Sequence, residues 1–180
     1  MTYIIVKTIM FNTKTNLLSA LTAVLFCLFA FTGCQPQQQN TSDFNFIFKY
    51  GVQGGNVLDT FKGMYTWDMV RGSDVTTRLT LTQDELNQIH TKMDEIDFWN
   101  YPDNFEVIPT GDLVSVVTPF NSYYFRVQNG NVTKELRWDD EITNPNAQAD
   151  KLRELITLIT GIIRSKPAYQ RLPEPRAVYL

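Results

Sequence analysis

An apolar run near the N-terminus, residues 17–31, constrains this chain more than any other stretch, because it separates an anchor segment from the part that can fold in water. The run carries no charge and follows the basic side chain of Lys14. A comfortable membrane span needs about 20 apolar residues, so this length is typical of the apolar region of a secretory signal. Two start sites, Met1 and Met10, both leave the segment intact.

The residues that close this run predict lipid attachment at Cys34. The sequence Phe-Thr-Gly-Cys that ends at Cys34 resembles the lipobox of bacterial lipoproteins, although Phe31 replaces the usual leucine. Small residues there let the backbone enter the signal peptidase, and the thiol takes up the diacylglyceryl chain. We therefore predict a lipoprotein signal peptide over residues 1–33, a membrane anchor at Cys34 on the outer face of the cell membrane, and a polar tether over 34–42. A plain secretory signal or an uncleaved membrane helix is the alternative.

Length, charge and cysteine content then limit the remaining part, residues 43–180, to one domain without disulfide bonds. Removing the first 33 of 180 residues leaves 147, enough for a single core. It also removes Lys7 and Lys14, which changes the net charge from −3 to −5. An acidic domain argues against nucleic acid as a partner. Both cysteines precede the domain, so we expect neither disulfides nor a thiolate metal site in it, and no cofactor is indicated.

The first half of the domain predicts three strands followed by a helix. Residues 43–50 alternate phenylalanine with polar residues, which is typical of a strand with one buried face. Further strands are expected over 57–69, bent at Gly63, and over 75–81. A capping box at Thr82 then starts a helix that should end near Ile96, and Phe98 and Trp99 are expected to plug the core beneath the sheet.

The second half repeats this order. We predict a strand over 112–118 and a hairpin whose strands, 123–127 and 132–138, flank the turn Asn129-Gly130 and pair Val127 with Val132. An amphipathic helix should follow, capped by Asn144 and stopped by Pro167, before an extended tail docked by Tyr169, Leu172 and Tyr179.

These elements predict an α+β fold made of two βββα units, 43–98 and 112–165, preceded by an N-terminal apolar signal helix. Strand runs closed by amphipathic helices favour antiparallel sheet with the helices packed on one face. The pattern leaves open whether the two units share one sheet or form two.

Three segments carry a resemblance to a known group of proteins. They read YGVQGGNVLDTFKGMYTWDM, LTLTQDELNQIHTKMDEIDFWNYP and IIRSKPAYQRLPEPRAVYL. Together they resemble a family of short, uncharacterised lipoproteins of Gram-positive bacteria. The resemblance implies the same location as the anchor and contributes no catalytic residue.

Three sets of titratable residues are candidate sites, and each has a simpler interpretation. His90 is the single histidine and lies beside the apolar stripe of the first helix, without a marked nucleophile, so we interpret it as a flanking or surface residue. Five acids lie on or near the first helix: Asp84, Glu85, Asp94, Glu95 and Asp97. Asp84 and Glu85 lie in its first turn, where the helix dipole favours negative charge. Asp139, Asp140 and Glu141 could hold calcium, but their spacing lacks the pattern of a calcium loop, which favours solvated acids.

Two further patterns resemble parts of known catalytic sites. Asp59 and Asp68 flank the aromatic residues of the second strand, as carboxylate pairs do in sugar-cleaving sites, but acids at strand ends are common. The glycine-rich stretch 51–55 lacks the following helix of a phosphate loop, and no serine-hydrolase, zinc-protease or Cys-x-x-Cys motif occurs.

The sequence therefore favours a membrane-tethered extracytoplasmic lipoprotein whose domain binds an unknown protein or cell-envelope ligand, with an inhibitor-like module as one form. The competing class is an extracytoplasmic hydrolase with carboxylates on its loops. An exposed hydrophobic patch would favour binding, and a deep pocket around a polarised carboxylate would favour an enzyme.

Overall fold

The structure, a computed structural model, describes residues 43–179. The predicted signal peptide, its signal helix, the anchor residue Cys34 and the tether lie outside these residues. In the part that is described, no helix is both long and apolar enough to cross a membrane.

The domain is α+β, with strands in two groups that are each followed by a helix. The elements are β1 (Phe44–Tyr50), β2 (Asn56–Asp59), β3 (Met64–Trp67), β4 (Val75–Arg78), α3 (Gln83–Glu95), the 3₁₀ helix η2 (Phe98–Asn100), β5 (Asn104–Phe105), β6 (Ser122–Asn129), β7 (Val132–Asp139), α4 (Ala147–Ser165) and α5 (Pro167–Gln170).

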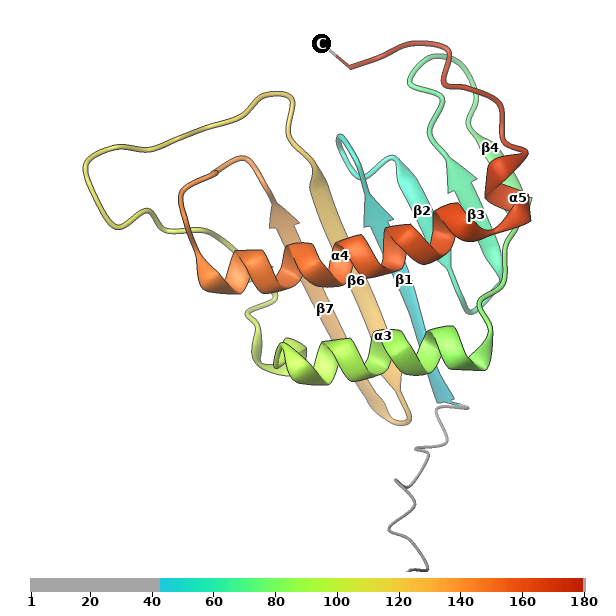
Figure 1. The fold of residues 1–180 in the computed structure, drawn as a ribbon, viewed down its shortest axis with the longest axis horizontal. Coiled ribbons are helices and arrows are strands. Elements are labelled where there is room, and N and C mark those ends of the chain that lie inside the picture. The colour runs from blue at the N-terminus through green and yellow to red at the C-terminus, as the bar shows by residue number, and fades with distance from the viewer. Residues whose placement is uncertain (1–42, 180) are drawn as a thin grey trace, which may run out of the picture. The chain divides into compact units, whose positions relative to one another are not determined.

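All strands of the described residues belong to one seven-stranded sheet in the order β4-β3-β2-β1-β6-β7-β5. Helices α3 and α4 lie across the same face of this sheet (Figure 1), as the sequence predicted. The expectation of two equivalent βββα units is wrong, because the first half forms a four-stranded meander and the second a hairpin with a short edge strand. That edge strand, β5, runs parallel to β7, so the sheet is mixed rather than purely antiparallel.

The core lies between the sheet and the two helices and is built around the phenylalanines of β1. Phe44, Phe46 and Phe48 alternate along the strand and are fully buried. The ring of Phe48 stacks on Phe125 of β6 at 4.7 Å between centroids, and Phe98 meets Phe125 edge-on at 5.4 Å. Phe98 is therefore the core plug that the sequence predicted. Trp99, predicted beside it, is only partly buried and donates its indole N–H to Asp94.

Helix α3 begins with the predicted capping box and is tied to the far end of α4 by an ion pair. Thr82 accepts a hydrogen bond from the Glu85 amide, and the Glu85 carboxylate accepts one from the Thr82 amide. The Lys166 ammonium also donates to Glu85 Oε1 at 2.7 Å. Burial by itself would raise the pKa of Glu85, but the hydrogen bonds from Lys166 and Thr82 outweigh it and hold that pKa below its usual value.

This lowered pKa predicts that acid weakens the domain. A carboxylate with a lowered folded-state pKa contributes stability above its usual pKa of 4.5, and that contribution is lost as the pH falls below this value. Glu85→Gln preserves the capping geometry but removes the charge. We expect its melting temperature to lie several degrees below that of the wild type at pH 7, and the difference to narrow as the pH falls below 4.5. Glu154→Gln, which breaks an exposed pair with Lys92, should change little. A difference that does not narrow below pH 4.5 would contradict the prediction.

The β6–β7 hairpin forms with a register two residues from the predicted one. Asn129 pairs with Val132 and Val127 with Lys134, so the turn residues are Gly130 and Asn131 rather than Asn129 and Gly130. Gly130 has a φ of +57°, which suits glycine at the first central position of a tight hairpin turn. The faces of both strands remain as predicted, because a shift of two residues preserves the alternation.

The backbone of Gly130 predicts a sensitive position on an otherwise exposed turn. A Cβ at this residue would meet nothing within 4 Å, so a substitution there tests backbone conformation alone. We expect Gly130→Val to destabilise the domain by about 1–2 kcal/mol, because a left-handed conformation is costly for a β-branched residue. Gly111→Val is the matched control, since Gly111 also has open space but no positive φ. Chemical denaturation should separate the two variants, and equal midpoints would refute the turn assignment.

Two other boundary predictions are corrected by the structure. The strand expected over 57–69 is a hairpin: β2 and β3 are joined by a turn at Gly63, which has a φ of +62°. Helix α4 is capped by Asn146, whose side chain accepts from two amides of the first turn, and not by Asn144. Asn144 bonds instead to the segment around Ser115, where it serves a different element.

The C-terminal tail packs against β3 and begins with a short helix rather than an extended segment. Pro167 ends α4 as predicted, but it also starts α5. Tyr169 lies edge-on to Trp67 at 5.3 Å, and the Trp67 indole donates to the Pro173 carbonyl. The Tyr179 hydroxyl bonds to Asp68 at 2.6 Å, so the predicted docking is confirmed.

Candidate functional site

A long loop between β5 and β6 exposes five aliphatic side chains and projects beyond the N-terminal end of α4 (Figure 1). We call residues 108–117 the aliphatic loop. Its exposed members are Ile108, Leu113, Val114, Val116 and Val117. Leu113 has 79% of its surface exposed and Val116 64%. Exposed aliphatics that cluster in this way mark an interaction surface more often than scattered ones do.

The aliphatic loop is held in an extended form by the segment that precedes α4. The Ser115 amide donates to the Asn144 side chain at 2.8 Å, and the Thr143 amide donates to the Ser115 carbonyl at 2.9 Å. The Val117 amide donates to the Glu141 carbonyl at 2.9 Å, which completes an antiparallel bridge between Val116 and Ile142. The predicted strand over 112–118 is therefore wrong as a member of the sheet. Its extended conformation is present, but it pairs outside the sheet.

These contacts leave one edge of the extended segment without partners. Leu113, Ser115 and Val117 direct their backbone groups toward residues 141–144. Because successive residues of an extended chain point their backbone groups to opposite sides, Val114 and Val116 direct theirs away. Among the described residues, no hydrogen bond involves the backbone of Val114 or Val116. The loop therefore presents a short strand edge with two free N–H and two free C=O groups.

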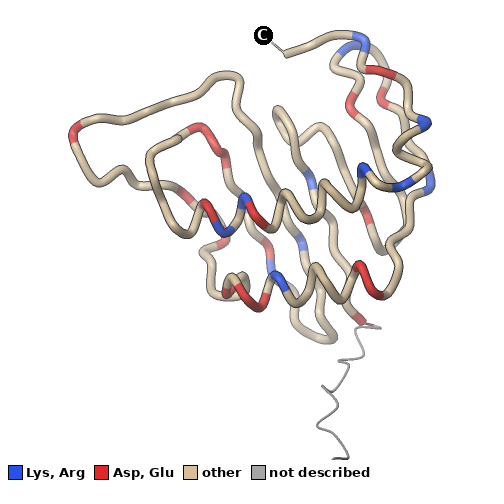
Figure 2. Tube along the Cα trace, viewed as in Figure 1, with Lys and Arg blue, Asp and Glu red and all other residues tan. Residues whose placement is uncertain are grey.

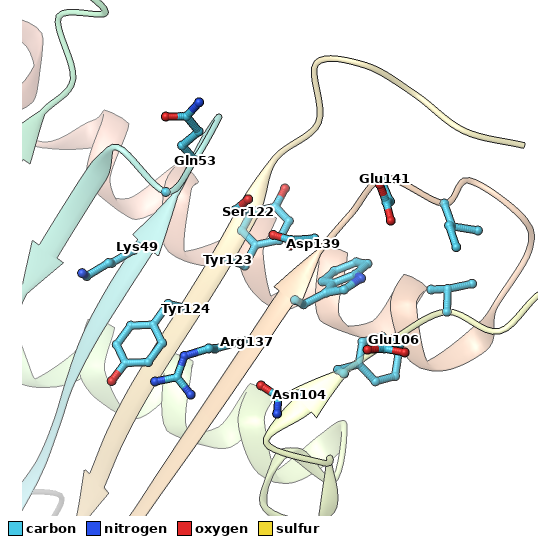
Figure 3. A pocket seen from close by; sticks show the side chains of 15 residues that line it. Lys49, Gln53, Asn104, Glu106, Ser122, Tyr123, Tyr124, Arg137, Asp139 and Glu141 are labelled. Atoms are coloured by element: carbon cyan, nitrogen blue, oxygen red, sulfur yellow. The ribbon is translucent and has the colours of Figure 1, made fainter.

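The base of the aliphatic loop borders a shallow hollow on the sheet, with a volume of about 500 Å³. Its lining combines cations, acids and aromatic rings from the strands and the loops next to them, among them Lys49, Tyr124, Arg137, Glu106, Asp139 and Glu141. Figure 3 shows Lys49, Tyr124 and Arg137 side by side on neighbouring strands. These side chains belong to the sheet face opposite the helices, which we call the open face.

Two cations cover the ring of Tyr124 on the open face. Lys49 Nζ lies 5.6 Å and Arg137 Cζ 5.0 Å from the ring centroid. Burial, and then the charge of Glu135, raises the pKa of the Tyr124 phenol, so the ring stays neutral at physiological pH. Arg137 also donates to Glu135 at 3.0 Å. The group forms a flat polar platform rather than a deep pocket, which suits contact with a surface or an extended chain.

Several acidic residues lie on or near the aliphatic loop, and most of them form no ion pair with another described residue. Figure 2 shows only acids on the loop and on the turn that follows β7. Asp140 of this turn is paired with Arg153 through two bonds of 2.6 and 3.1 Å. Glu106, Asp112, Asp139 and Glu141 form no ion pair with another described residue, so acids outnumber paired cations at this end of the domain.

A buried donor also lies near this end of the domain. The indole N–H of Trp138 is buried and has no acceptor among the described residues. The Trp138 ring is 2% exposed, contributes to the lining of the hollow, and is covered by the Arg153 guanidinium at 5.2 Å. Arg153 thus fixes both the ring and the turn that supports the aliphatic loop.

His90 has a structural environment and is buried rather than on the surface. It is 6% exposed, lies edge-on to Phe44 at 4.9 Å, and places Nε2 2.9 Å from the Asn129 amide nitrogen. Its Nδ1 lies 3.4 Å from Asp94. Both ring nitrogens have a polar neighbour: Asp94 lies one turn along α3, and Asn129 ties α3 to the β6–β7 turn. The residue is far from the hollow, since Asn129 ends β6 at the opposite end from Ser122.

The structure separates the acids that the sequence analysis considered together. Asp59 pairs with Lys62 at the β2–β3 turn, whereas Asp68 follows the other end of β3 and holds the tail. Glu85 belongs to the capping box, and Asp94 accepts from the Trp99 indole at 3.0 Å. Among residues 43–179 no group of three His, Cys, Asp or Glu side chains could hold a metal ion.

The strand predicted over 112–118 would place the second half of the aliphatic loop in the sheet, so the loop was not predicted as a surface. A usable signal was present, because Pro109 and Pro119 bracket the apolar stretch and restrict pairing at both ends. Asp139 and Glu141 were identified as loop acids, and the structure places both at the hollow.

Comparison with known proteins returned no relative. No family model, no curated protein and no solved structure matches this chain. The resemblance to a lipoprotein family therefore stays a prediction, and the geometry of the described residues is the basis for a functional proposal.

Proposed function

We propose that this protein is a lipid-anchored extracytoplasmic binding domain that presents the aliphatic loop to a partner protein. The observation that carries the proposal is the loop itself: five exposed aliphatic side chains on a segment fixed by hydrogen bonds to residues 141–144. A protein leaves such a surface uncovered when another molecule covers it in use. A preformed segment also costs less entropy on binding than a disordered one.

The position of the loop supports the anchored arrangement. The tether would enter the domain at Asp43, beside the start of β1, whereas the loop leads into β6 next to the end of β1. Seven residues of strand put about 20 Å between these two ends. A tether of eight polar residues holds a domain on the order of 15 Å from its anchor. The binding end is thus opposite the point where the tether joins.

The anchor is tested by replacing the lipidated residue. Lipidation needs the Cys34 sulfur, and a serine hydroxyl cannot replace it. We expect Cys34→Ser to eliminate metabolic incorporation of a labelled fatty acid and to leave the precursor uncleaved at this site. Membrane fractionation alone is a poor assay, because an uncleaved apolar segment would still hold the chain. Label retained on the serine variant would refute the anchor.

The binding role is tested by cross-linking in intact membranes. A cross-linked partner should be recovered with the wild type and lost with the double variant Leu113→Ser, Val116→Ser. Val178→Ser is the matched control, since Val178 is 75% exposed on the tail, away from the loop. If the double variant captures the same partners as the wild type, the loop is not the binding surface.

A further inference from the structure

The free edge of the aliphatic loop defines what kind of ligand fits it. We infer that the loop captures an extended segment of a partner polypeptide, which adds as a strand to the backbone of Val114 and Val116. This inference rests on the proposed binding function and specifies its mode. Strand addition draws its affinity from main-chain hydrogen bonds and its specificity from alternating side chains.

The backbone supplies the first part of the argument. The segment around Ser115 is already bridged on one side, so it is extended before any ligand arrives. Its other side offers the N–H and C=O groups of Val114 and Val116, which are spaced as in an antiparallel ladder. An incoming strand would satisfy all four groups at once.

The side chains indicate which residues the incoming strand carries. Leu113 and Val117 lie on one side of the extended segment, and Val114 and Val116 on the other. All four are exposed, so an added strand with apolar residues at alternate positions would bury them by cross-strand contact.

Charge selects one end of the incoming segment. Asp112 directly precedes the free edge and forms no ion pair with another described residue. Glu141 lies on the edge that is already bonded, so it does not face the incoming strand. Lysine or arginine at the end of the segment that lies beside Asp112 would therefore complement the loop and speed association at low salt, and lysines at both ends serve either strand direction.

A bilayer fits this loop less well than a polypeptide does. Hydrocarbon would leave the free groups of Val114 and Val116 unsatisfied, at a cost of several kcal/mol each. Asp112 would also have to approach anionic headgroups. A second copy fits poorly as well, because pairing two such loops would bring like charges together. The area that a five-residue strand edge can bury is also far smaller than the roughly 1,200 Å² that a stable dimer buries.

The test uses the full-length protein in nanodiscs of phosphatidylcholine and phosphatidylglycerol. The probe is a fluorescent synthetic peptide of alternating valine and threonine with two lysines at each end, and binding is followed by anisotropy. Val116→Pro removes the outward N–H without touching the bonds to residues 141–144, and proline is tolerated on an edge. We expect it to weaken binding about tenfold, which equals the loss of one backbone hydrogen bond. Val116→Thr, which keeps the N–H, should retain most of the affinity.

Two controls and a second readout complete the test. A peptide with glutamate in place of lysine, and one N-methylated along one edge, should both bind far more weakly. Hydrogen exchange of the Val114 and Val116 amides, which form no hydrogen bond to another described residue, should slow only when the lysine peptide is added. Slow exchange in nanodiscs without peptide would mean bilayer insertion, and slowing that depends on protein concentration would mean self-pairing. Either result overturns strand addition, as does equal binding by Val116→Pro. If cross-linking still depends on the loop, the binding role stands and only its mode is wrong.

Discussion

Replacing Leu155 by aspartate is expected to abolish soluble, folded protein. Leu155 is fully buried at the centre of the α4 face that packs on the sheet. The substitution removes a buried aliphatic side chain, which costs about 2–5 kcal/mol, and forces an unpaired charge into an apolar core, which costs several kcal/mol more. A domain of this size has a free energy of unfolding of about 5–15 kcal/mol, so the summed cost of the substitution removes most of its stability.

The control for this prediction lies half a turn along the same helix. Thr157→Asp adds the same charge at an exposed position and should leave the yield and the melting temperature close to wild type. Ile159→Asp, also at a fully buried position, should behave like Leu155→Asp. Leu155→Ala keeps the prediction measurable if the aspartate variants cannot be purified, with an expected loss of about 2–5 kcal/mol by denaturation. Wild-type stability of Leu155→Asp would mean that α4 does not pack there.

The second large effect is expected from Phe48→Ala. Phe48 is fully buried, and its ring stacks between Tyr50 at 5.0 Å and Phe125 at 4.7 Å. Its removal leaves a cavity between β1 and β6, where the two halves of the chain meet. We expect a loss of about 3–5 kcal/mol in the free energy of unfolding.

Ile47→Ala provides the comparison for this variant. Ile47 is the preceding residue on the same strand but lies on the open face, where it is only half-buried. Its truncation should cost clearly less than that of Phe48, and both losses should appear in the denaturant midpoint with an unchanged slope. Equal losses would mean that the open face is covered as fully as the core.

The sequence predicted those features that depend on neighbouring residues. The capping box of Thr82 and Glu85, the alternating phenylalanines of β1 and the apolar stripe of α4 are local patterns with one structural solution each. Each can be recognised without knowing what packs against it. The presence of helices on one face followed because each apolar stripe needs a sheet to cover it.

Pairing could not be predicted in the same way, because it depends on distant residues. Moving the β6–β7 turn by one residue shifts the register by two and leaves every side chain on its original face, so alternation cannot distinguish the two registers. Asn144 and Asn146 are equally good caps in sequence. The choice falls to Asn146 because Asn144 is engaged by the Leu113 carbonyl and the Ser115 amide.

Dependence on distant residues also explains why the sequence did not predict the candidate site. The apolar residues 113–117 predict an extended segment correctly, but nothing local says that one edge stays free. Likewise, the pairing of Tyr124 with Arg137 that builds the platform depends on the observed register, which the alternation of the two strands does not determine.

The central position of β1 has a consequence for the order in which the domain can form. Phe44 pairs with Asn129, 85 positions further along the chain, whereas its neighbour β2 follows within a few residues. Closing so long a segment is entropically slow, so the meander of β1 to β4 must wait for β6 before its sheet is complete. A growing chain whose last third is still to be synthesised would therefore remain without its complete sheet until β6 emerges.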